Sequence, residues 1–496
     1  MNNPDLNIVF VGKRIHLVGA KGTGMAALAE ILLEGGARLS GSDVSDTFYT
    51  DSILQELGVP VSAGFSLAGL PNDTELVIHS AAYSRDKNPE LLEAERREIP
   101  LLSYPEALGA LSRRMDSSGI AGVHGKTTTT ALAGSLAIAL NLPATILAGS
   151  AVTNFGGRST RILGDRYFIA ETCEYRRHFL HFKPRRIVLT SIEPDHQDYY
   201  PGYLDILEAF VEYIRLLPLG GELIYCIDDA GAHEAATKAQ SERPDIHMIA
   251  YGKKADSPWR LENYYAKEGR ATFRLAGLDC DFSLRVPGEH IALDATAALA
   301  LICSLLADQA GTAIESGFLP SFSEQTCMRN ALACFAGSKR RSEILGEREG
   351  VLFMDDYGHH PTAIRETIRG IKAFWPSRRL VVDFMSHTYS RTKALFEEFT
   401  RCLDEADVVI LHKIYASARE TPDLTLSGKS LYEAVRARRE SLRGSDNAAV
   451  SYYDEPMEAL KALSSSLKNG DLFLTMGAGD NWKLGLALLD GRGEHS

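Results

Sequence analysis

The segment from Gly122 to Thr128, GVHGKTT, has the residue types of a phosphate-binding loop. It follows an apolar run and opens a helical pattern, so its backbone N–H groups can bind phosphates at the positive end of a helix. Ile120 stands where the usual first glycine belongs, and the alternative is a glycine turn that only begins a helix. Lys126 can reach the β and γ phosphates of a nucleotide, and the Thr127 hydroxyl can ligate Mg²⁺. We therefore expect ATP and Mg²⁺ as cofactors, bound through Gly122, His124, Gly125, Lys126, Thr127 and Thr128.

Two further polar groups follow predicted strands in the same part of the chain. Glu171 ends the apolar run YFIAE, and the run EPDHQD (193–198) contains His196. A carboxylate and a neutral imidazole at adjacent strand ends can hold a divalent cation, and a reaction centre with several anions needs more than one cation. Glu171 and His196 are therefore candidate ligands of a second metal ion. The alternative for His196 is a loop histidine that is hydrogen-bonded to a neighbouring carboxylate.

A second glycine-rich turn, GAKGTG, runs from Gly19 to Gly24, and Asp43 follows the next predicted strand. Its glycine order, G-x-x-G-x-G, differs from the dinucleotide fingerprint G-x-G-x-x-G, so the turn does not predict NAD. A strand-to-helix turn of this kind still suits a diphosphate group. The alternative is a tight turn that binds no ligand.

Two clusters of titratable residues follow strands in the C-terminal part of the chain. DDYGHHP (355–361) precedes a helix that starts at proline, and SHTYSRT (386–392) follows another apolar run. Titratable side chains at the carboxyl end of a strand suit binding and catalysis, since a core strand needs none of them. Arg391 can bind a carboxylate. The alternatives are Asp residues that cap a helix and a solvated helix start.

These clusters require a scaffold that brings strand ends together. Short β-branched runs alternate with helix-period segments almost throughout the chain, which is the pattern of parallel α/β units. Open parallel sheets bind ligands beyond the carboxyl ends of their strands, where the polar clusters lie. The main predicted strands cover residues 14–20, 38–43, 75–82, 167–172, 185–192, 222–228, 246–252, 351–357, 379–385, 407–413 and 471–477.

The length of 496 residues favours about three domains, because a single hydrophobic core seldom grows this large. Polar joints at 112–119 and 333–343 separate the strand-helix units. The predicted fold class is α/β with three domains. Residues 1–112 form an N-terminal Rossmann-like domain, 113–336 a central P-loop ATPase-type parallel sheet, and 337–496 a C-terminal Rossmann-like domain.

Composition limits the possible partners and compartments. A net charge of -12 disfavours binding to nucleic acid, whose backbone attracts basic proteins. The N-terminus lacks the features of a secretory signal, and we predict no membrane insertion, so the protein is expected in the cytoplasm. Seven scattered cysteines without a CxxC pair indicate reduced thiols rather than a disulfide framework or a zinc site.

Taken together and in this order, the polar segments resemble the Mur ligase family. The resemblance covers nearly the whole chain, in the blocks GAKGTGMAALA, GVHGKTTTT, ETCEY, SIEPDHQD, VPGEHIALDATAA, FAGSKRRSE, DDYGHHPTAI, SHTYSRTK and MGAGDNW. It implies an N-terminal domain that binds a nucleotide sugar, a central ATPase domain, and a C-terminal domain that brings an amino acid.

The resemblance also implies a reaction in peptidoglycan precursor synthesis. ATP would phosphorylate the lactyl carboxylate of UDP-N-acetylmuramate, and the amine of L-alanine would attack the acyl phosphate with loss of phosphate. Two alternatives stay open. One is another Mur-type ligase, which recycles a peptide or adds a different amino acid, and the other is a UDP-sugar-binding regulator with impaired catalysis. We expect a monomer or a weak homodimer.

Residue roles follow from the resemblance one position at a time. Thr127, and Glu171 with His196, would hold the two Mg²⁺ ions. The residues expected to take part in catalysis are Lys126, Glu171, His196, His359 and Arg391. The nucleotide would also contact His290, Asp294, Arg340 and Asp356. The UDP-sugar and the amino acid would contact Gly19, Gly22, Thr23, Gly24, Asp43, Tyr357, His360, His387 and Arg391.

Several positions depart from the family pattern. Val123 replaces a threonine, Lys21 replaces a glycine of the first turn, and Thr388 stands where an arginine often follows the histidine. The largest departure is at the adenine contact H-N-x-x-N, where this chain has Ile291 and Asp294 in place of the two asparagines. Isoleucine cannot make the amide contact with adenine, so adenine selectivity is expected to be weakened or supplied by other residues.

Overall fold

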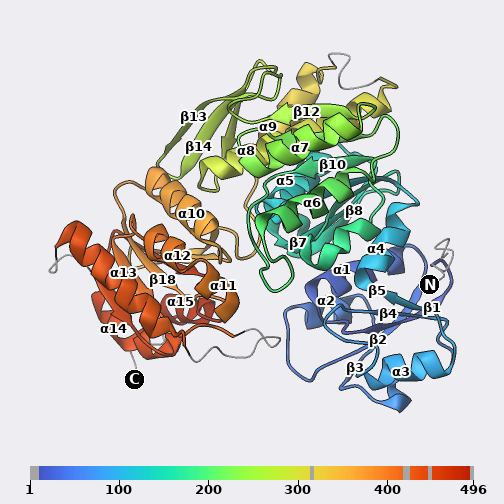
Figure 1. Ribbon diagram of the computed structural model, residues 1–496, viewed down its shortest axis with the longest axis horizontal. Helices are drawn as coiled ribbons and strands as arrows, with labels where there is room; N and C mark the ends of the chain where they lie inside the picture. Colours follow the sequence, from blue (N-terminus) through green and yellow to red (C-terminus); the bar gives the residue numbers. More distant parts are fainter. Residues whose placement is uncertain (1–9, 313–317, 417–424, 445–448, 492–496) are drawn as a thin grey trace. The chain divides into compact units, whose positions relative to one another are not determined.

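The computed structural model describes residues 10–312, 318–416, 425–444 and 449–491 (Figure 1). The outermost residues of the first and last predicted domains, 1–9 and 492–496, lie outside the described part. The chain clusters into two compact units. The first unit comprises Met1–Ile192, Leu207–Trp259 and Ala295–Ala331, and the second comprises Glu193–Ile206, Arg260–Asp294 and Leu332–Ser496.

The N-terminal sheet of the first unit is parallel throughout, with the strand order β3-β2-β1-β4-β5. The order reverses between β1 and β4, and the carboxyl ends of strands at such a reversal are where open parallel sheets bind ligands. All four residues of β4 are buried, as expected for a parallel strand that is covered on both faces. The elements are β1 (Arg14–Val18), α1 (Thr23–Glu34), β2 (Arg38–Asp43), α2 (Thr50–Glu56), β3 (Val61–Ala63), β4 (Leu76–His79), α3 (Pro89–Arg96), β5 (Leu101–Ser103) and α4 (Tyr104–Ser112).

The second sheet of the first unit has the order β12-β11-β10-β6-β9-β7-β8. All pairs are parallel except β7 and β8 at one edge, which are antiparallel. Because β6 lies between β10 and β9, the loops that follow these three strands meet at one edge of the sheet. The strands are β6 (Asp116–Ala121), β7 (Ala144–Val152), β8 (Arg158–Ile162), β9 (Tyr167–Glu171), β10 (Arg186–Leu189), β11 (Glu222–Cys226) and β12 (His247–Tyr251).

Five helices accompany this part of the chain, and α5 begins directly at the phosphate-binding loop. The helices are α5 (Lys126–Ala139), α6 (Tyr203–Ile214), α7 (Ala230–Glu242), α8 (Glu289–Gln309) and α9 (Phe322–Ala333). Among the described helices, α8 is the one long and apolar enough to cross a membrane, but 89% of its apolar stretch is buried inside the protein. Such burial is typical of a core helix.

A small antiparallel sheet in the second unit was missed by the sequence analysis. It consists of β13 (Leu261–Lys267), β14 (Arg270–Leu275) and β15 (Asp281–Leu284). Its strands alternate between buried and more exposed residues, so they lack the continuous apolar runs by which the parallel strands were recognised. The expectation of parallel α/β units is therefore wrong for this segment and for the two antiparallel edge strands β8 and β16.

The six-stranded sheet of the second unit has the order β16-β17-β21-β18-β19-β20, and only the edge pair β16 and β17 is antiparallel. Each strand sends alternate side chains to opposite faces. Leu352 and Met354 of β17 pack in a core with α10, α12 and α13, whereas Val351 and Phe353 pack in a second core with α14 and α15. Helices therefore cover both faces (Figure 1).

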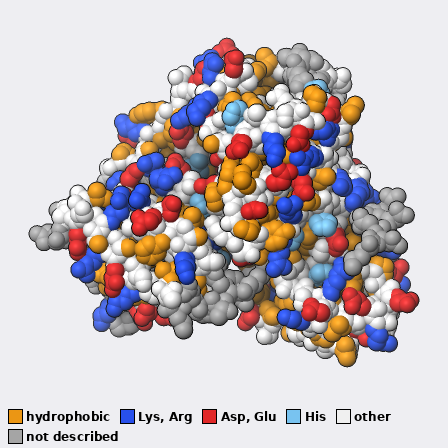
Figure 2. Space-filling view, in the orientation of Figure 1, with side chains coloured by type: hydrophobic (Ala, Val, Ile, Leu, Met, Phe, Trp, Pro, Cys, Tyr) orange, Lys and Arg blue, Asp and Glu red, His pale blue; other side chains and the backbone are white. Residues whose placement is uncertain are grey.

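The elements of this sheet confirm the predicted strands of the C-terminal part. They are β16 (Glu343–Arg348), β17 (Val351–Asp356), α10 (Pro361–Phe374), β18 (Arg379–Phe384), α11 (Tyr389–Ala394), α12 (Phe396–Cys402), β19 (Val408–Leu411), α13 (Gly428–Arg443), β20 (Val450–Tyr452), α14 (Leu460–Ser466), β21 (Asp471–Met476) and α15 (Trp482–Leu489). All seven cysteines are free thiols, as the composition predicts. Figure 2 shows acidic and basic side chains interspersed over the visible face.

Candidate active site

The phosphate-binding loop lies between β6 and α5, as the sequence predicts. Gly122 and Gly125 have φ values of 143° and 80°, a region that favours glycine. A Cβ atom on Gly122 would also collide with the side chain of Thr190. Ile120, which replaces the usual first glycine, is a fully buried residue of β6. The position therefore belongs to the strand and needs no glycine.

Residues that follow β10 hold the loop in place. The backbone N–H of His124 donates to Oγ of Ser191 at 2.9 Å, and Oγ1 of Thr190 donates to the carbonyl oxygen of His124 at 2.5 Å. The N–H of Val123 donates to the carbonyl oxygen of Ser191 at 2.9 Å. A neighbouring strand thus fixes the loop before any ligand binds, which is the preorganisation that phosphate recognition needs.

Glu171 lies beside the loop because the β6–β9 register pairs it with Ile120. Oγ1 of Thr127 donates to Oε2 of Glu171 at 2.8 Å, and the same oxygen accepts the N–H of Gly149 at 2.8 Å. Two oxygen ligands at right angles around one Mg²⁺ lie about 3 Å apart, since each Mg–O bond is about 2.1 Å. The structure therefore brings two predicted metal ligands together at a spacing that fits a single Mg²⁺.

Lys126 begins α5, and its Nζ lies 2.8 Å from Oε2 of Glu174. Burial by itself lowers the pKa of the Lys126 ammonium, but the negative charges around it, chiefly the Glu174 carboxylate, raise it overall. The lysine therefore carries a full positive charge at the loop. Glu174 was not among the predicted site residues, although it belongs to the quoted block ETCEY.

A cavity of about 140 Å³ lies in the first unit beside Glu171. One wall belongs to the N-terminal part of the chain and includes Gly24 and Tyr104, whereas the other includes Glu171, Cys173 and Phe179. A ligand held at the start of α1 can therefore extend through this cavity to the Glu171 carboxylate, next to the phosphate-binding loop.

The N-terminal glycine turn is held by Asp43 from β2. The Asp43 carboxylate accepts the N–H of Lys21 at 2.7 Å, the N–H of Val44 at 2.8 Å and the hydroxyl of Tyr83 at 3.1 Å. Burial and this carboxylate raise the pKa of Tyr83 to about 12. A Cβ atom on Gly19, whose φ is 82°, would lie 2.6 Å from the Tyr83 ring. The contacts place Asp43 in support of the turn that is expected to bind the diphosphate.

Lys21, which stands in place of a common glycine, points away from the turn. Its Nζ lies 3.0 Å from Asp51 and donates to the carbonyl oxygen of Asp46 at 2.9 Å. Thr23 accepts a hydrogen bond from the Tyr49 hydroxyl at 3.0 Å. Gly22 is the N-cap of α1 and supplies no side-chain cap. The first N–H groups of this helix are thus arranged as an anion site requires.

In the second unit, Asp355 and Asp356 end β17 and are both buried. Burial raises the pKa of each carboxyl above its ordinary value. Asp355 forms an ion pair with Nε of Arg340 at 2.8 Å, and Asp356 accepts the N–H groups of Ser342 at 2.7 Å and Gly358 at 2.6 Å. These carboxylates anchor the segment before β16 to the end of β17.

Tyr357, His359 and His387, three of the predicted site residues, come together at the carboxyl ends of β17 and β18. The ring centroids of Tyr357 and His359 are 5.1 Å apart, and those of His359 and His387 are 6.1 Å apart. The His387 ring also stacks on Tyr415 at 6.0 Å. Burial and the nearby Arg391 guanidinium hold the pKa of His359 well below its ordinary value, so this imidazole is neutral at pH 7.

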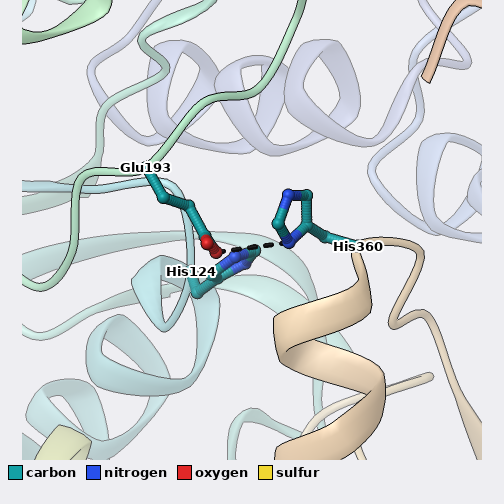
Figure 3. A group of neighbouring side chains, drawn as sticks. All are labelled: His124, Glu193 and His360. Atoms are coloured by element: carbon teal, nitrogen blue, oxygen red, sulfur yellow. Dashed lines mark ion pairs between the residues drawn. The ribbon is translucent and has the colours of Figure 1, made fainter. Parts of the chain in front are cut away.

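His360 is the N-cap of α10, and its Nδ1 accepts the N–H of Thr362 at 3.3 Å. Figure 3 shows the Glu193 carboxylate directed at the His360 ring, where Nδ1 and Oε1 are 3.2 Å apart. The second Glu193 oxygen accepts the Thr362 hydroxyl at 2.9 Å. The EPDHQD run therefore meets the start of α10 through Glu193.

Arg391 binds a carboxylate of the protein itself. Its Nε and Nη2 donate to Oδ1 of Asp195 at 3.0 and 2.8 Å, and its Nη1 lies 3.4 Å from Nδ1 of His387. Asp195 also accepts the N–H of His196 at 2.7 Å, and His196 has a φ of 53°. The predicted metal ligand His196 and the predicted carboxylate ligand Arg391 thus share one partner, which the sequence analysis did not identify.

The predicted adenine contacts lie at the start of α8. Gly288 has a φ of 124°, and the His290 ring packs where a Cβ on this glycine would stand. Ile291 and Asp294 are both buried, at 4% and 7% exposure. Ile291 is therefore part of the hydrophobic core.

Three family models match the chain in succession. Residues 14–115 match the Mur ligase family catalytic domain, residues 120–302 the Mur ligase middle domain, and residues 340–479 the Mur ligase glutamate ligase domain.

Named relatives match almost the whole chain. A UDP-N-acetylmuramate–L-alanine ligase of Treponema pallidum is 52% identical, over 97% of this chain and 96% of that protein. A protein of the same name from Borreliella afzelii is 39% identical, over 95% and 97%. The crystal structure of the UDP-N-acetylmuramate–alanine ligase of Thermotoga maritima superposes with a TM-score of 0.75 at 23% identity, covering 97% of this chain and all of that one. With its three α/β domains and phosphate-binding loop, the chain belongs to the Mur ligase family.

Proposed function

We propose that the protein uses ATP to join L-alanine to UDP-N-acetylmuramate, the reaction for which its relatives with 52% and 39% identity are named. One observation carries the proposal. The cavity runs from Gly24 of the N-terminal glycine turn to Glu171, whose carboxylate is in contact with Thr127 of the phosphate-binding loop. A sugar whose diphosphate is bound at the turn can therefore bring its carboxylate to the γ-phosphate of ATP.

The first step is transfer of the γ-phosphoryl group. A carboxylate oxygen of the sugar bonds to the phosphorus, the bond to the ADP oxygen breaks, and an acyl phosphate forms. Lys126 stabilises the negative charge on the transferring group, and the N–H groups at the start of α5, from Lys126 to Thr128, bind the phosphates. In the second step the alanine amine attacks the acyl carbon and loses a proton, and inorganic phosphate leaves.

We assign Mg²⁺ as the metal of this site, with Thr127 as a ligand of one ion and Glu171 with His196 as the expected ligands of a second. The contact between Thr127 and Glu171 lets the carboxylate reach the first ion as well. When bound, the metal supplies positive charge for the phosphoryl oxygens. The carboxylate and hydroxyl oxygens of Glu171 and Thr127 are the hard donors that Mg²⁺ prefers, and their 2.8 Å separation supports the assignment.

The amine substrate is assigned to the carboxyl ends of β17 and β18. Tyr357, His359 and His387 form the adjoining aromatic group, and the neutral imidazole of His359 can accept the proton that the amine loses. Arg391 is assigned to the alanine carboxylate through Nη1, because Asp195 occupies its other two donors.

The remaining assignments concern the nucleotide and the domains. The proposed contacts of ATP are His290, Asp294, Arg340 and Asp356. His360 is proposed to contact the nucleotide and the amino acid where the two ligands meet. We propose that residues 1–112 bind the UDP-sugar, 113–336 bind ATP and 337–496 bind alanine. We also propose that the protein acts in the cytoplasm as a monomer or weak homodimer, without membrane insertion or nucleic acid.

The substrate assignment is tested with purified protein, Mg-ATP and UDP-N-acetylmuramate. Phosphate release is measured with each single amino acid and with the tripeptide L-alanyl-γ-D-glutamyl-meso-diaminopimelate. Release with L-alanine supports the proposal. Release with the tripeptide alone identifies a peptide-recycling ligase, and binding of the UDP-sugar without any release identifies a regulator.

A further inference from the structure

All three N–H groups of the Lys126 ammonium have acceptors within the first unit. Nζ lies 2.5 Å from the carbonyl oxygen of Gly122, 2.8 Å from Oε2 of Glu174 and 3.4 Å from the carbonyl oxygen of Val123. The first two distances are those of strong hydrogen bonds, whereas the third is at the outer limit. The ammonium is thus held firmly on two sides and loosely on the third.

The Glu174 carboxylate is a buried partner. Its side chain is 3% exposed, and that of Lys126 is 13% exposed. An exposed ion pair contributes little, because water screens the charges and both side chains can move. At this depth the loss of one partner leaves a charge without compensation, so the carboxylate strongly restrains the lysine.

The chain around Glu174 adopts an uncommon conformation. Arg176 and Arg177 have φ values of 52° and 59°, in the left-handed region that non-glycine residues seldom occupy. The N–H of Arg177 donates to the carbonyl oxygen of Glu174 at 2.8 Å. Two consecutive residues of this kind cost free energy, and surrounding structure must hold them.

Helix α6 supplies that surrounding structure. Arg177 forms an ion pair with Glu212, and the Phe179 ring stacks on Tyr213 with centroids 4.5 Å apart. The segment after β9 is therefore braced at its far end, while Glu174 at its near end faces Lys126.

We propose that Glu174 is the positioning residue of Lys126. Its carboxylate, together with the carbonyl oxygen of Gly122, fixes the ammonium so that the weakly held N–H, now on Val123, is the one presented to the phosphates of ATP. The inference rests on the proposed use of ATP at this loop. Glu174 itself touches no reacting atom in this account and acts through the lysine.

A carboxylate near a phosphate site also opposes nucleotide binding by charge repulsion. This gives the proposal a distinctive signature. Neutralising Glu174 should leave ATP binding equal or tighter, yet slow the reaction, because the lysine loses its alignment for the transition state.

The test compares Glu174→Gln, Glu174→Asp and Glu242→Gln in the full-length protein. We expect Glu174→Gln to lower kcat roughly 10- to 100-fold without raising the KM for ATP or L-alanine. Glu174→Asp keeps the negative charge but moves it farther from Lys126. Its kcat should lie between that of Glu174→Gln and that of the original protein. Glu242→Gln makes the same chemical change on an exposed carboxylate of the first unit that pairs with Arg215, and its kcat should stay within about twofold of the original.

Three outcomes overturn the proposal. They are an unchanged kcat in Glu174→Gln, an equal loss in Glu242→Gln, and a rise in the KM for ATP with kcat retained. Thermal unfolding of each variant shows whether a loss of kcat reflects unfolded protein, and Glu174→Asp then decides the question. If the unaltered protein releases no phosphate from ATP, the proposed function fails instead, whatever the variants do.

Discussion

Arg391 and Asp195 form an almost wholly buried ion pair across 196 positions of the sequence. The pair uses Nε and Nη2 of the guanidinium and a single carboxylate oxygen, so only the Nη1 side remains directed at His387. Burial alone would raise the pKa of Asp195, but the Arg391 guanidinium holds it well below its ordinary value. The Asp195 carboxyl is therefore charged at neutral pH, and the two hydrogen bonds that it accepts set the direction of the Arg391 guanidinium.

Asp195→Asn should raise the KM for L-alanine about 10-fold, because the loss of orientation at one charged contact is worth about 1.4 kcal/mol. The KM for UDP-N-acetylmuramate should change little. Steady-state phosphate release with each substrate varied in turn measures both values. The matched control is Asp404→Asn, which removes the carboxylate partner of Arg438 in the same unit. Asp404 is more exposed than Asp195. An unchanged KM for alanine would separate Arg391 from amino-acid binding.

Lys126→Ala should lower kcat roughly 1,000-fold, since it removes the cation that stabilises the transferring phosphoryl group. Binding of UDP-N-acetylmuramate should persist, because the glycine turn of the N-terminal sheet is untouched. Turnover and equilibrium binding of the UDP-sugar are measured on the same preparation. Loss of sugar binding in a folded variant would contradict the proposed division of the chain.

Gly24→Ala should raise the KM for UDP-N-acetylmuramate about 10-fold. The new Cβ would lie 2.8 Å from Cζ of Tyr104, a half-buried ring at the wall of the cavity, so one of the two must move. Gly24→Ala with Tyr104→Leu restores space and should recover part of the affinity. If the double variant is no better than the single one, the cavity is not the path of the sugar.

Removal of Mg²⁺ with a chelator should abolish turnover, and Thr127→Val should raise the Mg²⁺ concentration needed for half-maximal rate about 10-fold. Valine has nearly the shape of threonine but no hydroxyl, so it removes one ligand with little change in packing. Thr127→Ser keeps the hydroxyl and should restore the original requirement. The rate of each of the three proteins is measured as a function of the Mg²⁺ concentration. Identical curves would show that Thr127 is not a ligand of the metal.

The stabilising contribution of His412 to the second unit should be lost as the pH rises. Its Nε2 lies 2.7 Å from Oδ2 of Asp383 and its Nδ1 lies 3.0 Å from the carbonyl oxygen of Tyr453, so both nitrogens face acceptors. Burial by itself lowers the pKa of His412, but the Asp383 carboxylate raises it overall. The charged form is therefore favoured by folding. Its contribution is fully present below the unfolded pKa of about 6.5 and is lost as the pH rises through the folded value.

Thermal unfolding followed between pH 6 and pH 9 measures this effect. His412→Gln should unfold at a lower temperature than the original protein at pH 6, and the difference should shrink at higher pH. Lys413→Gln is the control, because the neighbouring residue pairs with the exposed Glu455 on the surface. A difference that is constant with pH would mean that His412 is neutral in the folded protein.

Local patterns in the sequence were sufficient for the elements that begin the site. The apolar run before Gly122 and the helix period after Lys126 predict a strand, a turn and a helix, because backbone hydrogen bonding and side-chain alternation act over a few residues. The two glycine turns are predicted for the same reason. Gly19, Gly122 and Gly125 have positive φ values, and glycine is the residue type that adopts them without strain, so the residue type itself indicates the turn.

Prediction from the sequence failed for strands that are half-exposed and for a residue that lies in a different element from the one expected. The antiparallel strands β13 to β15 carry alternating burial without apolar runs, and they were not among the predicted strands. Ile120 resembled a defect in the phosphate loop, but the loop starts later and Ile120 is a buried strand residue. Both errors arise because burial is a property of the folded surroundings.

By itself, the sequence determined the strands, turns and helices that begin the site and the residue types at the ends of those strands. Only the tertiary structure decided which of these residues meet. Glu171 faces Thr127 because β9 lies next to β6, Glu174 holds Lys126 for the same reason, and Arg391 turns to Asp195. Strand order and the burial of opposite charges depend on packing between segments far apart in the chain, and no local periodicity records that packing.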